Sequence, residues 1–273
     1  MIEARALRVA IGPKILLDGV SLEVRAGEVV AVVGPNGAGK STLRKVLCGD
    51  MQPTGGEVFM DQRPLDEWPL TERARVRAVM GQDSTLSFPF TVLEVVMMGR
   101  SPHLRGAEGP RDYEIARAAL EDVEAMHLEE RLYPTLSGGE RQRVQLARVL
   151  AQIWEAHAER SRYLLLDEPT SSLDLSHQHS TLEVARKFAR EGVGVLVILH
   201  DLNLAAQYAD RLLMLKDGRL VASGQPVAVL TSETIQETFA IPVIVTKHPH
   251  LDCPLVLPTK ARMKDESVII QDE

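Results

Sequence analysis

A glycine-rich stretch between residues 34 and 42 carries the strongest functional motif of the chain. It reads GPNGAGKST and fits the spacing G-x-x-x-x-G-K-[ST]. Glycines let the backbone wrap closely around an anion, so that successive N–H groups can donate to phosphate oxygens. Lys40 supplies a mobile cation for the β- and γ-phosphates, Ser41 offers a hydroxyl to Mg²⁺, and a helix expected to begin near Gly39 turns its positive end to the same anion. The stretch therefore predicts a nucleoside triphosphate site made by Gly34, Pro35, Asn36, Gly37, Ala38, Gly39, Lys40, Ser41 and Thr42.

Two adjacent acids follow a second apolar run. Residues 163–166 read as a buried strand, and Asp167 and Glu168 come directly after it. Ligand-facing residues of a doubly wound sheet lie at the carboxyl ends of its strands. We therefore expect Asp167 to hold Mg²⁺ through a water molecule and Glu168 to orient or deprotonate the attacking water. Two strand-end acids before Pro169 could also simply cap a turn, but the phosphate loop favours the catalytic interpretation.

Two further polar residues end predicted strands. His200 follows the apolar run 193–199, and Gln82 follows the alternating stretch 76–80. A satisfied core histidine and an ordinary turn glutamine are the alternatives. We expect His200 to contact the γ-phosphate and Gln82 to join Mg²⁺ or the water. The predicted catalytic side chains are Glu168, His200 and Gln82, and the predicted metal ligands are Ser41, Gln82 and Asp167.

A second loop that opens a helix reads LSGGE. Ser137 and Glu140 fit the capping box S-x-x-E, which would explain the pair in an isolated helix. Two adjacent glycines, however, expose a second set of N–H donors for which this chain has no second nucleotide. We therefore expect the γ-phosphate of a second copy to be met by Leu136, Ser137, Gly138, Gly139 and Glu140.

The elements around these residues predict an α/β fold. Short apolar or alternating runs predict strands at 3–10, 15–24, 29–33, 57–60, 76–80, 163–166, 193–199, 212–215 and 220–222. Between residues 84 and 154 strand signals are missing and helical stripes recur, which indicates a helical insertion. A short helix at 233–239, a proline-rich strand-like stretch and a charged end from Ala261 close the chain.

Composition narrows the classes of function. The 273 residues carry a net charge of −7 and no large basic stripe, which argues against a nucleic-acid ligand. Cys48 and Cys253 are far apart, as expected for free thiols in a reducing compartment. The first residues lack the apolar core of a signal peptide, and no apolar run approaches the ~20 residues that span a bilayer. We expect a cytoplasmic protein whose membrane role would come through a partner.

In their order along the chain these motifs resemble those of the ATP-binding-cassette ATPases. Residues 34–41 are similar to the Walker A motif, 163–168 to Walker B and 136–140 to the signature motif; Gln82, Asp174 and His200 match the Q-loop, D-loop and switch histidine. The resemblance implies ATP and Mg²⁺ as cofactors. It also implies a P-loop NTPase (RecA-like) core with an N-terminal antiparallel β subdomain and an inserted α-helical subdomain.

The same resemblance divides the chain into parts of one domain, 1–273. The catalytic core with its β subdomain would take 1–83 and 155–240, the helical signature subdomain 84–154, and a C-terminal extension 241–273. Two copies would form a head-to-tail homodimer, with each ATP between Lys40 of one copy and Ser137 of the other. Ile11 stands where the family usually has an aromatic residue that stacks on adenine, a contact worth about 1–3 kcal/mol per base.

Three stretches, 91–103, 201–210 and 218–224, resemble the subfamily that energises import of iron chelates, cobalamin and haem. Segments 151–162 and 239–258 resemble its haemin-import branch. The implied role is the ATPase subunit of a bacterial haem importer, peripheral on the cytoplasmic face of the inner membrane. Its partners would be an integral permease dimer and, indirectly, a periplasmic substrate-binding protein; a ferric siderophore or cobalamin is the alternative cargo.

The sequence leaves two other interpretations open. A non-transport cassette protein of translation, DNA repair or iron–sulfur assembly is the alternative from another class, but translation factors usually carry two cassettes and repair proteins carry long coiled-coil or zinc insertions. His248, His250 and Cys253 could suggest a haem or metal site. Pro249 and Pro254 make that stretch a loop or edge strand, so we expect no direct haem binding.

Overall fold

The computed structural model describes residues 1–81, 88–104, 106–156 and 160–259. Gln82 and the charged end from Ala261 lie outside the described residues. None of the helices in the described part of the chain has both the length and the apolar character that a bilayer-spanning segment requires.

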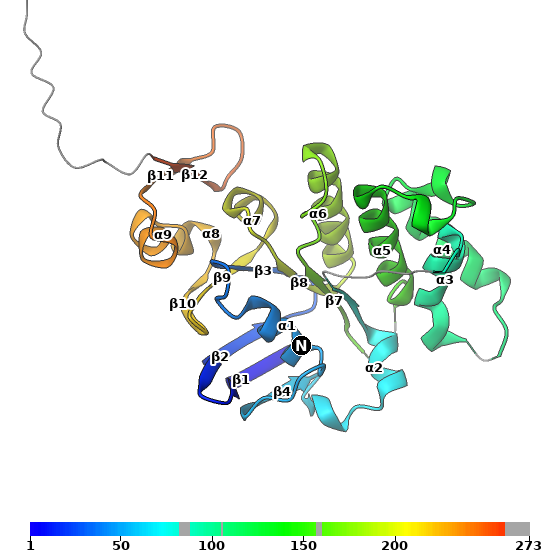
Figure 1. The fold of residues 1–273 in the computed structure, drawn as a ribbon, viewed down its shortest axis with the longest axis horizontal. Coiled ribbons are helices and arrows are strands. Elements are labelled where there is room, and N and C mark those ends of the chain that lie inside the picture. The colour runs from blue at the N-terminus through cyan, green and yellow to red at the C-terminus, as the bar shows by residue number, and fades with distance from the viewer. Residues whose placement is uncertain (82–87, 105, 157–159, 260–273) are drawn as a thin grey trace, which may run out of the picture.

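A six-stranded sheet with the order β10-β9-β3-β8-β7-β6 forms the centre of the molecule (Figure 1). Its strands are β3 (Val29–Val33), β6 (Arg77–Met80), β7 (Arg162–Asp167), β8 (Val193–Ile198), β9 (Arg211–Lys216) and β10 (Arg219–Gly224). The pairs from β9 to β6 are parallel, and β10 adds an antiparallel edge. Every residue of β3, β7 and β8 is buried, as expected for parallel strands covered on both faces.

A second, antiparallel sheet confirms the predicted N-terminal β subdomain. Its order is β2-β1-β4-β5, with β1 (Ile2–Ile11), β2 (Lys14–Val24), β4 (Gly55–Met60) and β5 (Arg63–Pro64). Alternate residues of the central strands, such as Val30 and Val32, share one hydrophobic core with this sheet and with α1 (Lys40–Leu47).

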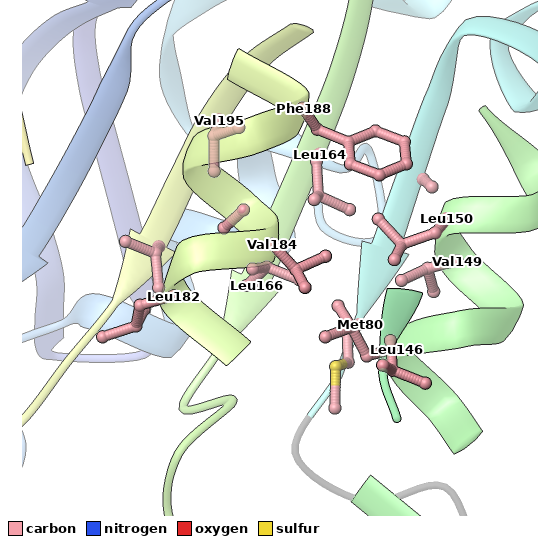
Figure 2. Close-up of a cluster of buried hydrophobic side chains, with 14 of the residues drawn as sticks. Met80, Leu146, Val149, Leu150, Leu164, Leu166, Leu182, Val184, Phe188 and Val195 are labelled. Atoms are coloured by element: carbon pink, nitrogen blue, oxygen red, sulfur yellow. The ribbon is translucent and has the colours of Figure 1, made fainter. Parts of the chain in front are cut away.

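The opposite face of the central sheet packs on helices. Figure 2 shows Leu164 and Leu166 of β7 meeting Leu150 of α5 (Gly138–Gln152) and Phe188 of α6 (Leu175–Arg190) within one buried cluster. The other helices are α2 (Leu70–Val76), α3 (Val92–Met97), α4 (Pro110–Asp122), α7 (Leu202–Tyr208), α8 (Pro226–Val229) and α9 (Ser232–Phe239), with short 3₁₀ turns η1 (Leu65–Glu67), η2 (Met98–His103), η3 (Met126–Leu128) and η4 (Tyr133–Thr135). The hairpin of β11 (Val243–Lys247) and β12 (Pro254–Pro258) lies beside α7 and α9.

The predicted helical character of the insertion is confirmed. Between residues 88 and 156 the described residues form helices and turns, with an isolated bridge between Thr91 and Leu132. The segment after α3 forms η2, and a Cβ on Gly99 would lie 2.1 Å from the Arg148 carbonyl oxygen, so this segment packs directly on α5. The boundaries 84 and 154 of this subdomain stay a prediction.

Candidate functional site

The carboxyl ends of three neighbouring strands open on one edge of the central sheet. Val32 of β3 pairs with Ile198 of β8, and Ile198 pairs with Asp167 of β7. The glycine-rich loop, His200 and the pair Asp167–Glu168 therefore follow strands that lie side by side. The structure brings these predicted residues together at the place where an open α/β sheet binds its ligand.

The glycines of the loop are required by its backbone. Gly37 and Gly39 have φ of 81° and 104°, in the region that L side chains rarely adopt. Gly39 is also the N-cap of α1, and a Cβ there would lie 2.7 Å from the Leu16 carbonyl oxygen. The carbonyl oxygen of Ala38 accepts a hydrogen bond of 3.0 Å from the Gly218 N–H in the turn between β9 and β10. The conformation of the loop is therefore stabilised by the β9–β10 turn as well as by its own glycines.

Lys40 is the cation at the mouth of this loop. Its side chain is buried, and Nζ donates to the carbonyl oxygens of Gly34 at 2.6 Å and Pro35 at 3.0 Å. Burial lowers the pKa of Lys40 below its ordinary value. An ammonium group that is already partly desolvated and surrounded by backbone dipoles is suited to a phosphate.

Asp167 is a buried carboxylate at the end of β7. It is 2% exposed, and its Oδ2 accepts a hydrogen bond of 2.8 Å from Arg44 Nε. Its Oδ1 is buried without a hydrogen-bond partner in the described part of the chain, which suits an oxygen kept for a metal-bound water. Burial raises the pKa of Asp167, and Arg44 opposes that rise. Ser41 lies exposed in the first turn of α1, so Ser41 and Asp167 fit Mg²⁺.

Glu168 is held in a strained position against His200. Its φ is 51°, an uncommon left-handed conformation for a residue with a side chain. Its N–H donates to the Ile198 carbonyl oxygen at 3.2 Å, and its carbonyl oxygen accepts from Gln142 Nε2 at 3.1 Å. His200 Nε2 lies 2.6 Å from Glu168 Oε1 and is 48% exposed, so the alternative of a buried, satisfied core histidine is wrong.

The LSGGE stretch forms the predicted capping box at the start of α5. Ser137 Oγ accepts from the Glu140 N–H at 3.3 Å, and Glu140 Oε2 accepts from the Ser137 N–H at 2.7 Å. Leu136 is buried, whereas Ser137 and Gly138 are exposed. The hydrogen bonds of this stretch go to nearby residues, and among the described residues none of them reaches the loop 34–42.

Asp174 and Ile11 take surface positions. Asp174 caps α6 by accepting from the His177 N–H at 2.9 Å, and its side chain is 68% exposed. Ile11 is the last residue of β1, pairs with Lys14 of β2 and is 59% exposed. In the β11–β12 turn, His248 Nδ1 accepts the backbone N–H groups of His250 and Leu251 at 3.1 and 3.0 Å, which gives this histidine a structural role.

Two side chains of the site were missed by sequence reasoning. Arg44 meets Asp167, and Gln142 meets the backbone of Glu168. Spacing offered a signal for Arg44, because it lies three residues after Ser41 and therefore on the same face of α1. Gln142 follows the LSGGE motif without any local sign of its contact.

A groove of about 390 Å³ lies between the central core and the helical insertion. Arginines from both sides line it, and Gln152 crosses it by donating to the carbonyl oxygens of Ala74 at 2.6 Å and Arg77 at 3.0 Å. Its lining is completed by Asp50, Leu70, Arg73, Val79, Met98, Gly99 and Arg148.

Comparisons with known proteins agree with this arrangement. A family model described as ABC transporter matches residues 17–171. The chain is 61% identical over 258 residues to the Hemin import ATP-binding protein HmuV of Gloeobacter violaceus, covering 94% of each chain. Among solved structures it resembles a metal-chelate type ABC transporter in an inward-facing conformation (TM-score 0.79, 27% identity, 95% and 97% of the two chains). It also resembles a dimeric bacterial ABC transporter cassette (TM-score 0.72, 29% identity, 82% and 98%).

Proposed function

This chain belongs to the ABC transporter family, and we propose that it is the ATP-hydrolysing subunit of a bacterial importer that carries haem across the cytoplasmic membrane. The observation that carries the proposal is the 61% identity over 94% of the chain to a hemin import ATP-binding protein. The glycine-rich loop, the pair Asp167–Glu168 and His200 follow the neighbouring strands β3, β7 and β8. Together they supply the groups that ATP binding and hydrolysis need.

In the proposed reaction the chain acts by positioning and by electrostatics. Lys40 and the N–H groups of the loop hold the phosphates, and Glu168 orients the attacking water. His200, paired with Glu168, reaches the γ-phosphate. Ser41 and Asp167 would hold Mg²⁺, which when bound neutralises phosphate charge. Gln82 stays a prediction as a further ligand or water-positioning residue.

A second copy of the chain completes each site in this proposal. Ser137 and Gly138 are exposed at the start of α5, and the dimeric cassette among the structural relatives supports a two-fold arrangement. The N–H groups of residues 136–140 would meet the γ-phosphate held by the partner's loop, with Asp174 near the interface. Ser137 Oγ accepts a bond within its own helix, which leaves its hydrogen to donate outward.

We further propose that the arginine-lined groove receives the membrane permease, which would place the subunit on the cytoplasmic face of the membrane. Burial lowers the pKa of both Arg77 and Arg148, and their Nε atoms have no hydrogen-bond partner within the described residues. Among the described residues lining the groove Asp50 alone is acidic. Arg77 already donates from Nη1 to the Cys48 carbonyl oxygen at 2.6 Å, so a permease segment bearing a carboxylate would complement the positive charge of the groove as a whole. Leu70, 72% exposed, would provide an apolar contact at the rim.

The test of cargo is reconstitution of the chain with its permease in proteoliposomes. Binding protein loaded with haem should raise ATP hydrolysis, and a ferric siderophore or cobalamin should not. Stimulation by one of those instead would change the cargo, whereas recovery with ribosomes or DNA in place of a membrane partner would contradict the transport role.

The docking groove has its own test. Arg73→Glu reverses a charge on the core side of the groove and should reduce recovery of the permease in detergent pull-downs. Arg190→Glu, an exposed arginine at the end of α6, is the matched control. Equal recovery of the permease by both variants would show that docking uses another surface.

A further inference from the structure

We infer that Arg44 is a positioning residue of the metal site, where its guanidinium fixes one oxygen of Asp167 so that the other faces the metal-bound water. The inference rests on the proposed function, because hydrolysis of ATP is what requires the metal. It starts from a juxtaposition in the structure: Arg44 Nε lies 2.8 Å from Asp167 Oδ2, while Asp167 Oδ1 is buried without a hydrogen-bond partner in the described part of the chain.

The helix geometry brings Arg44 to this place. Helix α1 begins at Lys40, directly after the glycine-rich loop, and contacts β7. Ser41 and Arg44 are three residues apart and share one face of α1. The same helix therefore presents the proposed metal hydroxyl and the arginine to the end of β7, with Lys40 one residue before Ser41.

Burial makes the ion pair more than a surface contact. The side chains of Arg44 and Asp167 are 12% and 2% exposed, so water screens their attraction little. A charge-assisted hydrogen bond of this length fixes the carboxylate plane as well as its charge. Because Oδ2 accepts the hydrogen bond from Arg44, Oδ1 is the oxygen of Asp167 that remains to accept one from a metal-bound water.

Other cations near Asp167 are engaged elsewhere. Lys40 Nζ donates to the loop carbonyl oxygens of Gly34 and Pro35. The outer contact of Arg44, from Nη1 to Asp50 Oδ2 at 3.3 Å, involves a side chain that is 56% exposed and is correspondingly screened by solvent. The contact with Asp167 is therefore the stronger anchor of the guanidinium.

The test compares three variants of the full chain. Arg44→Leu removes the guanidinium, and Arg44→Lys keeps the charge but loses the planar fork. Lys45→Leu is the matched control: it removes a cation from the next position of α1, where the side chain is exposed and forms no ion pair among the residues that the structure describes. Mn²⁺ serves as the probe, and its binding to the protein–nucleotide complex is followed by electron paramagnetic resonance.

We expect Arg44→Leu to weaken Mn²⁺ binding about 10-fold, the lower end of the range for an outer-shell partner, because Asp167 itself meets the metal through water. Arg44→Lys should fall between Arg44→Leu and the wild type, and Lys45→Leu should match the wild type. Binding of a fluorescent ATP analogue in the presence of a chelator should be the same for all four proteins, because the loop holds the phosphates without Asp167.

Two outcomes would overturn the inference. If Arg44→Leu binds Mn²⁺ within about twofold of the wild type, well short of the loss of about 10-fold that is expected, Arg44 does not position Asp167. If metal-free binding of the nucleotide falls equally, Arg44 supports the helix in general and not the carboxylate. Failure of the wild type itself to bind Mn²⁺ with nucleotide would instead contradict the proposed metal site.

Discussion

Replacing Glu168 by glutamine should separate nucleotide binding from nucleotide hydrolysis. The substitution keeps the length of the side chain and a hydrogen-bonding partner for His200, which lies 2.6 Å from Glu168 Oε1. It removes the negative charge that would orient the attacking water or accept a proton from it. The left-handed backbone at residue 168, with φ of 51°, is supported by contacts of the main chain and should persist.

The expected magnitudes differ sharply for activity and stability. A positioned general base contributes about 10²–10⁴-fold to a rate, so turnover should fall at least about 100-fold, or about 2.7 kcal/mol of activation free energy. The contact with His200 is screened by solvent because His200 is 48% exposed. Losing it should cost at most about 1 kcal/mol, a shift of roughly 2–4 °C in melting temperature.

Phosphate release under saturating ATP, affinity for a fluorescent ATP analogue and thermal unfolding are the three measurements. Glu121→Gln, an exposed acid on α4, is the matched control and should retain wild-type turnover. Steady-state hydrolysis by Glu168→Gln above about a tenth of the wild-type rate would refute the role of Glu168, given the 10²–10⁴-fold contribution of such a base.

Three other perturbations follow from the packing. Gly99→Ala places a Cβ 2.1 Å from a carbonyl oxygen of α5 and should destabilise the fold by about 1–3 kcal/mol in urea unfolding, whereas Gly55→Ala meets its nearest atom at an ordinary 3.6 Å and should be neutral. Burial lowers the pKa of His103 below its ordinary value of 6.5. The neutral side chain therefore contributes stability above pH 6.5, and this contribution is lost as the pH falls through the lowered pKa. In His103→Gln the urea midpoint should fall less on acidification than in the wild type. Burial raises the pKa of both free thiols, and Cys48 is 0% exposed, so a thiol reagent should label Cys253 in the native state and Cys48 after unfolding. Native labelling of Cys48, an unchanged pH response or equal midpoints for the two glycine variants would contradict these expectations.

The centre of the fold could be predicted because its signals are local. The continuous apolar runs of β3 and β8 and the phosphate-loop spacing are legible without knowledge of neighbours. Helix α2 could not be predicted because seven residues leave no full amphipathic stripe. The strand expected from Val76 begins at Arg77, because Val76 is the last residue of that helix.

The contacts that complete the site could not be predicted because they join distant segments. Arg44 is an ordinary helix residue until β7 brings Asp167 beside it, and Gln142 gains its partner only when α5 packs near the end of the same strand. The left-handed conformation of Glu168 has no local cause, since glutamate has no preference for it. Such strain is imposed by the surrounding structure.

The hydrogen bond from Gly218 to Ala38 has a consequence for how the protein is made on the ribosome. The phosphate loop emerges early, but both neighbours of β3 in the sheet, β8 and β9, are synthesised late. A nascent chain that ends before residue 211 has the complete nucleotide motif and lacks the strand and turn that support it. Nucleotide binding can therefore mature only near the end of translation, and arrested chains should expose an unfinished, apolar sheet edge to chaperones.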